Sequence, residues 1–262
     1  MEQMIEDFPI KLNKSDTALT PATDKLFHVD KSKRLDKTRA EQFHTFIAKA
    51  LFISKRARPD IQPTVAVLCT RVRESNESDW NKLIRLMKYL NGTRNFKLRL
   101  QVENLNCVKY FVDAAFAVHN DFKSHTGGVM TMGKGAIASI SKKQKMNTRS
   151  STAAELVAAD DVIGLILWTK LFLEAQGYEI NRNILFQDNK STILLEENGK
   201  KSSGKRTRHL NIRYFFLTDQ IEKGNISIQY CPTDEMIGNY MSKPLQGEKF
   251  RKFRKDILNL RE

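Results

Sequence analysis

The sequence predicts an α/β domain preceded by a mostly helical region. Up to about residue 100 the apolar residues recur at helical spacing, whereas after Gln101 the chain becomes rich in β-branched and aromatic residues. From there the expected elements follow the order β-β-β-α-β-α-α-β-α. The 262 residues allow one large or two modest domains, and 40% hydrophobic residues are enough for a packed core.

The N-terminal part begins with a polar stretch, residues 1–37, which Pro9 and Pro21 interrupt. We expect an extended lead-in there. Helical periodicity then predicts three helices, over residues 38–55, 60–72 and 78–91. Pro59 separates the first two, because the residue before a proline avoids the helical region. The third has Ser78 as its predicted N-cap and Gly92 as its C-terminal glycine. Residues 38–104 are thus a predicted helical region.

The remaining elements belong to a predicted domain over residues 105–246, followed by a basic tail over residues 247–262. Strands are expected near residues 106–117, 126–132, 136–142, 183–187 and 226–231. Glycines in Thr126-Gly127-Gly128 and Gly133-Lys134-Gly135 predict turns or bulges around the second and third strands. Helices are expected over residues 151–176, 191–197 and 209–223 and from about Asp234. The first of them has a broad apolar face made of Leu156, Ala159, Ile163, Ile166, Trp168, Leu171 and Leu173.

Composition narrows the class of partner. Lysine and arginine number 44 against 30 acidic residues, so the net charge is +14, which favours a polyanion such as nucleic acid. The three cysteines lie far apart without a CxxC pair, which excludes a disulfide framework or zinc module and fits a reducing compartment. The longest apolar stretch, residues 162–168, is too short to cross a bilayer, and no apolar signal region opens the chain. We therefore expect an intracellular protein without a membrane partner.

Three acidic residues stand where such a topology can bring them together. Asp113 interrupts an apolar strand, Glu155 lies near the start of the long helix, and Asp188 ends another apolar strand. A carboxylate in a buried strand is unfavourable unless it is paired or binds a metal, and magnesium prefers oxygen ligands. Each acid also has a plain structural interpretation. These are a turn or salt-bridge acid, a helix-dipole acid and a strand-to-helix cap, respectively, and spacing alone leaves both interpretations open.

Several motifs follow one another in order along residues 106–245. They are Phe111-Val112-Asp113-Ala114, Asn147-Thr148-Arg149-Ser150-Ser151-Thr152-Ala153-Ala154-Glu155-Leu156, Gln187-Asp188-Asn189, Lys205-Arg206-Thr207-Arg208-His209-Leu210, Arg213-Tyr214-Phe215 and Ser242-Lys243-Pro244-Leu245. In this order and at this spacing, they resemble the ribonuclease H domain of copia-type retrotransposon Pol polyproteins. Residues 40–100 resemble the thumb or connection segment that precedes this domain, through Arg56-Ala57-Arg58-Pro59-Asp60-Ile61, Trp80 and Met87-Lys88-Tyr89-Leu90-Asn91-Gly92-Thr93.

The resemblance implies a ribonuclease H-like fold, which is a five-stranded mixed sheet flanked by helices. It also implies cleavage of the RNA strand of an RNA–DNA hybrid with two magnesium ions, or with manganese instead. Asp113 matches the acid that bridges both ions, and Glu155 and Asp188 match two further ligands. The implied partners are the hybrid and the remainder of the Pol polyprotein, including polymerase core and integrase. The implied location is a cytoplasmic virus-like particle or the nucleus.

The sequence departs from the family pattern at two points. Asn239 stands where the pattern has a fourth aspartate, so three carboxylates face the +4 charge of two magnesium ions. We expect a weakened fourth ligand and a raised magnesium requirement, with Asp234 or Glu235 as candidates for compensation. A catalytically impaired nucleic-acid-binding remnant and an acid-rich sheet without metal are the alternatives. A polymerase-type Tyr/Phe-Val-Asp-Asp turn is also missing, so we expect a C-terminal fragment that does not polymerise DNA.

Basic residues and one histidine complete the candidate site. His209 matches a mobile catalytic histidine of ribonucleases H, although it can equally be the first residue of a helix. Candidate phosphate-binding residues form two clusters, which are Lys142, Lys143, Lys145 and Arg149, and Lys200, Lys201, Lys205, Arg206 and Arg208. The alternative for both clusters is a solvated charged surface.

Overall fold

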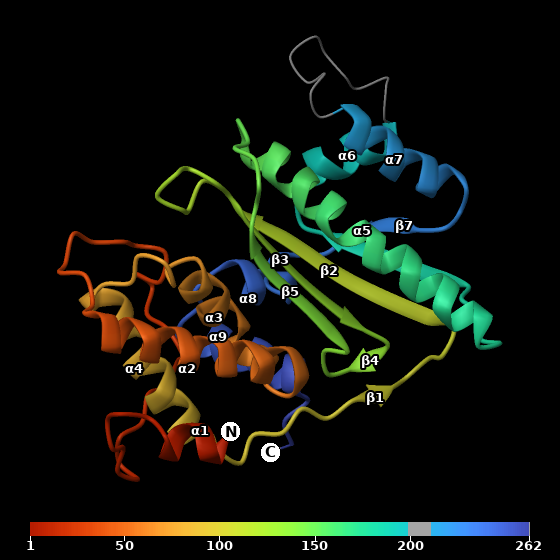
Figure 1. The fold of residues 1–262 in the computed structure, drawn as a ribbon. Helices are drawn as coiled ribbons and strands as arrows, with labels where there is room; N and C mark the ends of the chain where they lie inside the picture. Colours follow the sequence, from red (N-terminus) through yellow and green to blue (C-terminus); the bar gives the residue numbers. More distant parts are fainter. Residues whose placement is uncertain (199–210, 262) are drawn as a thin grey trace. The chain divides into compact units, whose positions relative to one another are not determined.

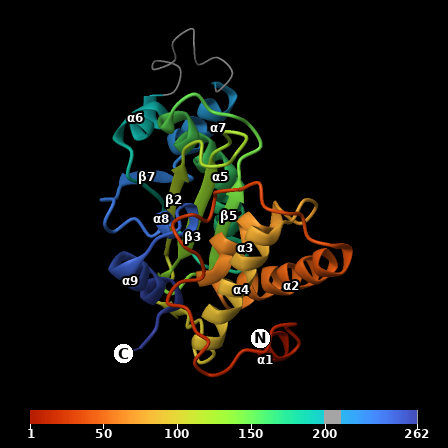
Figure 2. The same cartoon turned by 90° about the vertical axis from the view of Figure 1, so that its left-hand side faces the viewer.

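The computed structural model describes residues 1–198 and 211–261 (Figures 1 and 2). The chain divides into two units, the first made of Met1–Arg99 with Pro244–Glu262 and the second of Leu100–Lys243. The predicted domain boundaries at residues 37, 104 and 246 remain predictions. The C-terminal segment, however, joins the helical unit and is no separate tail.

The first unit is helical, as the periodicity predicts. Its helices are α1 (Glu2–Glu6), α2 (Lys37–Arg56), the 3-10 helix η1 (Pro59–Ile61), α3 (Gln62–Cys69), α4 (Glu77–Gly92) and α9 (Gly247–Leu258). The expected extended lead-in differs from the structure, because it begins with helix α1 and buries Phe8. The Phe8 ring meets Phe46 edge-on at 5.0 Å and stacks over Trp80 at 6.0 Å. Aromatic packing therefore ties this polar segment to α2 and α4.

Helix α4 starts at Glu77, one residue earlier than predicted, and its cap is Asn76 instead of Ser78. The side chain of Asn76 accepts a hydrogen bond from the Asp79 N–H at 3.0 Å, and the Asp79 carboxylate accepts one from the Asn76 N–H at 3.2 Å. This reciprocal capping box satisfies two N–H groups that the first turn leaves without helical partners. Gly92 is the last helical residue, and a Cβ there would lie 2.9 Å from the Thr17 Cβ.

A buried ion pair at η1 is hydrogen-bonded to the C-terminal end of α4. The guanidinium of Arg58 binds both oxygens of Asp60, at 2.8 and 2.7 Å, and the Tyr89 hydroxyl donates a further bond to Asp60 at 2.7 Å. Thr93 accepts two more hydrogen bonds from Arg58. The two charges are almost fully buried, they pair with each other, and each has a further hydrogen-bond partner at the C-terminal end of α4.

The predicted basic tail instead forms helix α9. Its lysines and arginines lie mostly on one side, whereas Phe250, Phe253, Ile257 and Leu258 are buried on the other. This spacing of three, four and one residues places the apolar side chains on one helical stripe. The Phe250 ring meets the Tyr89 ring at 6.1 Å, so α9 is part of the first unit's core.

The second unit contains the predicted five-stranded mixed sheet. Its order is β5 (Ala138–Lys143), β3 (His125–Thr131), β2 (Cys107–Ala115), β6 (Arg182–Gln187) and β7 (Ser227–Tyr230). The pairs β5–β3 and β3–β2 are antiparallel, and β2–β6 and β6–β7 are parallel. Two short strands, β1 (Gln101–Val102) and β4 (Gly133–Lys134), pair with each other separately. The expectation of a five-stranded mixed sheet flanked by helices is thereby confirmed.

Four helices accompany this sheet in Figure 1, namely α5 (Ser151–Ala175), α6 (Lys190–Asn198), α7 (Asn211–Glu222) and α8 (Gly238–Ser242). Helix α5 packs against β2 and β3, and Leu156, Ala159, Ile163 and Ile166 are buried in the shared core. Two other members of its predicted apolar face, Trp168 and Leu171, are exposed. The amphipathic prediction therefore holds for the N-terminal part of α5 and fails near its C-terminus.

The glycines predicted to form a turn lie inside strand β3. Gly127 pairs with Asp113 across the β2–β3 ladder, and a Cβ on Gly127 would lie 2.4 Å from the backbone nitrogen of Ser242. Glycine is required here because the backbone of α8 approaches the strand closely. The helix that approaches Gly127, α8, is the last predicted one, and it starts at Gly238 instead of near Asp234.

Among the described residues, no helix is both long enough and apolar enough to traverse a bilayer.

Candidate active site

Asp113 lies near the C-terminal end of the central strand β2, and only 1% of it is exposed. Both of its carboxylate oxygens have partners from the segment around α8. The Ser242 hydroxyl donates a hydrogen bond to Oδ2, and the Lys243 ammonium lies 3.1 Å from Oδ1. Asp113 therefore does form a salt bridge, with Lys243, as one of its structural interpretations predicts. The turn interpretation is wrong, because Asp113 lies inside strand β2.

Glu155 enters the same region from helix α5. The Ser150 side chain caps this helix by accepting a hydrogen bond from the Ala153 N–H at 3.1 Å, which fixes where the first turn begins. The carboxyl of Glu155 is buried, and burial raises its pKa well above the usual range. The negative charge of Asp113 raises this pKa further, and a cation beside Glu155 would favour its ionised form.

Asp188 directly follows β6, the parallel neighbour of β2. Because parallel strands end at the same edge of a sheet, its carboxylate reaches the region of Asp113. The Thr233 hydroxyl donates a hydrogen bond to Asp188 Oδ2 at 3.0 Å. The strand-to-helix cap expected of the pair Asp188-Asn189 is made by Asn189, whose side chain accepts a hydrogen bond from the Thr192 N–H at 3.2 Å.

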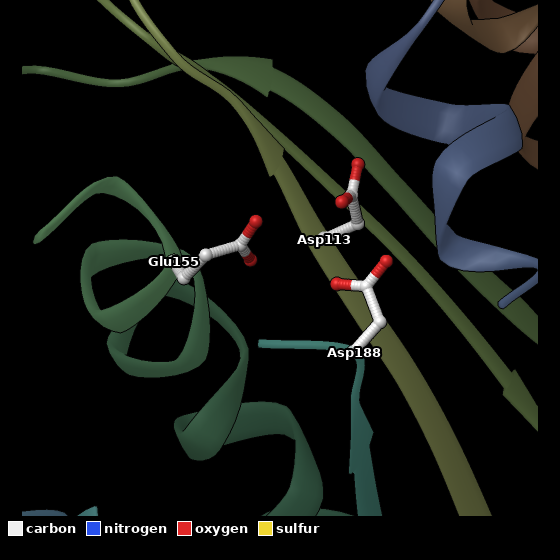
Figure 3. A group of neighbouring side chains, drawn as sticks. All are labelled: Asp113, Glu155 and Asp188. Carbon is white, nitrogen blue, oxygen red and sulfur yellow. The ribbon is translucent and has the colours of Figure 1, made fainter. Parts of the chain in front are cut away.

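The three carboxylates converge, as Figure 3 shows. One oxygen from each of Asp113, Glu155 and Asp188 can be chosen so that all three atoms lie within 4.8 Å of one another. Three ionised carboxylates this close repel one another, so they need protons or a cation. Oxygen donors of this kind suit a hard divalent ion such as magnesium. Manganese prefers the same donors, so the donor set alone does not distinguish the two ions.

Asn239 is buried in α8 and uses both ends of its amide. Its Nδ2 donates a hydrogen bond to the Thr233 carbonyl at 3.2 Å, and its Oδ1 accepts one from Lys243 Nζ. The predicted weakened ligand therefore faces an ammonium group. Neither Asp234 nor Glu235 belongs to the carboxylate group, so the structure provides no compensation from these two positions.

Lys243 and Ser242 are the residues that the sequence reasoning missed. Both are in the Ser242-Lys243-Pro244 motif, which served only as a mark of resemblance. A signal was available, because Asn239 and Lys243 are four residues apart, a spacing that brings side chains together on a helix. Their contact with Asp113 has no such local signal.

The basic candidates are only partly described. Lys142 pairs with Asp161 at 2.9 Å and Lys143 with Asp121 at 2.8 Å, so both already have acidic partners. Lys145 and Arg149 are exposed and form no ion pair within the described ranges. The other candidates lie outside the described residues, and they are Lys200, Lys201, Lys205, Arg206, Arg208 and His209.

Known proteins with similar sequences are Pol polyproteins of transposons. The chain is 26% identical over 259 residues to the retrovirus-related Pol polyprotein from transposon TNT 1-94 of Nicotiana tabacum, which covers 95% of this chain and 19% of that protein. It is 29% identical over 202 residues to the corresponding polyprotein from transposon RE1 of Arabidopsis thaliana, covering 76% and 14%. The chain thus spans a fifth or less of these relatives. No protein-family model matches it.

Solved structures with partial similarity include an RNase H1 isolated from compost, with 16% identity, a TM-score of 0.37 and coverage of 49% of this chain and 86% of that one. A foamy viral protease-reverse transcriptase in complex with an RNA/DNA hybrid has 12% identity, a TM-score of 0.43 and coverage of 80% and 26%. The similarity to transposon Pol polyproteins extends over most of the chain, and the chain has the five-stranded mixed sheet with flanking helices that the resemblance implies.

Proposed function

We propose that this chain is a metal-dependent ribonuclease H that hydrolyses the RNA strand of RNA–DNA hybrids, as the C-terminal part of a retrotransposon Pol polyprotein. The observation that supports it most is the convergence of Asp113, Glu155 and Asp188 at the ends of two parallel strands. Similarity to transposon Pol polyproteins supports the same reaction class. The proposed surroundings are a cytoplasmic virus-like particle or the nucleus, with polymerase core and integrase as further parts of the polyprotein.

The three carboxylates would hold the divalent ion, which supplies Lewis-acid polarisation of the scissile phosphate and a nucleophilic water near neutral pH. The chain's own groups orient these ligands. Ser242 donates a hydrogen bond to Asp113, and Thr233 donates one to Asp188, so each carboxylate has a hydrogen bond that favours one orientation. Burial of Glu155 keeps water from screening the negative charge that attracts the cation.

Lys145 and Arg149 are the described candidates for holding the nucleic acid. They lie on the segment that leads from β5 into α5, the helix that carries Glu155. Exposed cationic side chains there can contact phosphates without reading bases. The A-like shape and 2′-hydroxyls of a hybrid would then provide recognition, and affinity would fall steeply with salt.

The test is cleavage of an end-labelled RNA–DNA hybrid by the full chain in magnesium or manganese. We expect RNA-strand cleavage that Asp113→Asn abolishes. Asp219→Asn is the matched control, because this half-buried aspartate of α7 pairs with Lys223 and lies outside the carboxylate group, so the rate should be unchanged. Absence of cleavage at every metal concentration, with hybrid binding retained, would overturn the proposal.

Hybrid binding without cleavage corresponds to the alternative, a nucleic-acid-binding remnant. One contact favours this alternative. The Lys243 ammonium binds the Asn239 amide, so a cationic side chain already occupies the fourth ligand position. A cleaving protein excludes this alternative.

A further inference from the structure

The Lys243 ammonium lies between two groups that belong to the candidate site. Its Nζ is 3.1 Å from Asp113 Oδ1 and donates a hydrogen bond to Asn239 Oδ1. Asp113 and Asn239 are the two residues that, by the sequence expectation, hold a second metal ion. A cationic side chain is therefore already where that ion's two protein ligands meet.

The lack of charge on Asn239, rather than the orientation of its amide, favours an ammonium over a metal ion. Its Nδ2 donates to the Thr233 carbonyl, so the oxygen end must point to Lys243. A neutral amide oxygen is a good acceptor for an N–H donor, whereas a hard dication attracts a carboxylate more strongly. The asparagine thus fits the lysine that it faces.

The backbone holds Lys243 in this place. The Lys243 N–H donates to the Asn239 carbonyl at 3.0 Å, and the preceding Ser242 hydroxyl binds the second oxygen of Asp113. Gly127 lets this segment approach β3 closely, since a Cβ there would lie 2.4 Å from the Ser242 nitrogen.

The charges support the same assignment. Asp113, Glu155 and Asp188 together carry −3 when ionised, and Asn239 carries no charge. One divalent ion and one ammonium neutralise this charge completely. Two divalent ions beside Lys243 would leave an excess of +2 in a region where Asp113 and Glu155 are buried, and unbalanced charge at low dielectric is unfavourable.

We propose that Lys243 replaces the second metal ion, so that the carboxylate group binds a single divalent cation. This rests on the proposed metal-dependent nuclease function and changes its metal stoichiometry. The lysine is a fixed positive charge, and 40% of its side chain is exposed, so a substrate phosphate can approach it. Such a charge stabilises developing negative charge without needing to be recruited from solution.

The first experiment counts bound Mn²⁺ in the full-length free protein by electron paramagnetic resonance. We expect one ion in the wild type and one in Lys243→Arg, which keeps the charge. We expect two ions in the double variant Asn239→Asp with Lys243→Met, which has four carboxylates and no ammonium. Two ions in the wild type, or a single ion in the folded double variant, would overturn the proposal.

The second experiment uses a single substitution and does not depend on folding of the double variant. Because Lys243→Met removes a positive charge next to Asp113, we expect Mn²⁺ affinity to rise about ten-fold or more. Lys223→Met is the matched control, since it removes a lysine from another aspartate pair, on α7, and should leave the affinity unchanged. Unchanged or weaker Mn²⁺ binding by folded Lys243→Met contradicts the proposal.

The proposed number of metal ions and the proposed nuclease activity can be contradicted independently. A wild type that cleaves hybrids but binds two ions keeps the nuclease function and removes the role of Lys243. A wild type that binds one ion and cleaves nothing overturns the nuclease function, while the proposal that Lys243 takes the place of the second ion still holds. Absence of metal binding in the wild type and in Lys243→Met overturns both.

Discussion

Asp113 and Gly127 lie directly opposite each other in the antiparallel ladder of β2 and β3. The missing side chain of Gly127 makes room for the backbone of α8, which places Ser242 and Lys243 against the Asp113 carboxylate. A glycine in one strand thereby determines which groups surround an acid in the next strand.

Gly127→Ala should consequently disturb both stability and site. The added Cβ meets backbone atoms at 2.4 to 2.8 Å, so α8 must move. We expect a loss of about 1–3 kcal/mol in unfolding free energy, measured by urea denaturation, together with reduced hybrid cleavage. Gly164→Ala is the control, since a Cβ there contacts nothing within 4 Å and should be neutral or stabilising by up to about 1 kcal/mol.

The Arg58–Asp60 pair should dominate the stability of the helical unit. Asp60→Asn leaves the Arg58 guanidinium buried without its charge partner, and Tyr89 loses a charged acceptor. Removing one partner of a buried pair costs about 3–5 kcal/mol, which urea denaturation of the full chain would reveal. A change below about 1 kcal/mol would contradict this importance of the pair.

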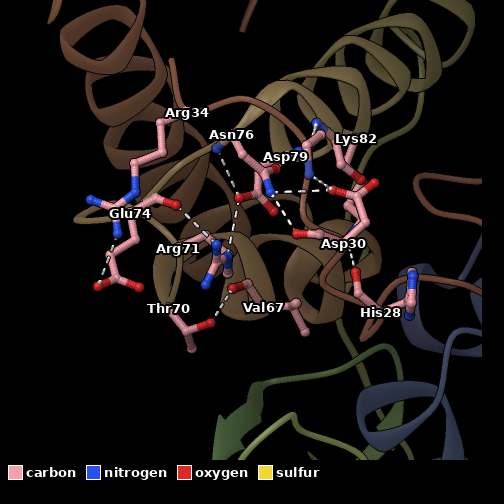
Figure 4. Close-up of polar contacts among 12 residues, drawn as sticks. His28, Asp30, Arg34, Val67, Thr70, Arg71, Glu74, Asn76, Asp79 and Lys82 are labelled. Atoms are coloured by element: carbon pink, nitrogen blue, oxygen red, sulfur yellow. Dashed lines mark hydrogen bonds and ion pairs between the residues drawn. The ribbon is translucent and has the colours of Figure 1, made fainter. Parts of the chain in front are cut away.

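The exposed pair Arg34–Glu74, which Figure 4 includes, provides the control for that experiment. Its charged groups are 3.7 Å apart and most of both side chains faces solvent. We expect Glu74→Gln to change the unfolding free energy by no more than about 1 kcal/mol, because water screens such a pair.

Two histidines should make the fold sensitive to acid. His119 Nε2 and His125 Nδ1 are 3.0 Å apart, and His125 Nε2 is 2.8 Å from the Ser141 hydroxyl. Burial lowers the pKa of His119 to about 4 and that of His125 to about 3, and in each case a neighbouring group adds to the effect. The folded protein therefore keeps both rings neutral at pH values where the unfolded chain binds protons.

The sign follows from that difference. The unfolded state binds more protons below about pH 6.5, so stability should fall as the pH drops from there toward 4, by up to about 1.4 kcal/mol per pH unit for each histidine. Buried Glu196, whose pKa is raised by burial, acts in the opposite direction. Urea denaturation of wild type and His125→Gln between pH 7 and 4 isolates the histidine, and parallel pH profiles would refute its contribution.

Lys145 and Arg149 should contribute to hybrid affinity through phosphates. For Lys145→Ala or Arg149→Ala we expect weaker binding to hybrids of any sequence, and a slope of log affinity against log salt that is smaller by about 1. Lys223→Ala, directly after α7, is the control. Fluorescence anisotropy over a salt series provides the slopes, and slopes equal to that of the wild type would exclude phosphate contact by these two residues.

Local pattern was sufficient for much of the fold. Alternation and helical spacing located every strand of the five-stranded sheet to within a few residues, because each element buries one side. Local pattern was insufficient to choose between two neighbouring candidates for the N-cap of α4. Asn76 and Ser78 are both good caps, and only the contact with Asp79 selects Asn76. The apolar stripe of α9 was readable from its spacing, but its many basic residues suggested a tail.

The candidate site divides in the same way. By itself, the sequence was sufficient to name Asp113, Glu155 and Asp188 as candidates, because each stands in a motif that resembles the ribonuclease H domain. Only the tertiary structure decided what faces them. The close approach of α8 to Gly127 brings Lys243 and Asn239 to Asp113 across 130 residues of chain. Charge balance in a buried site depends on distances between such remote groups, which no local spacing contains.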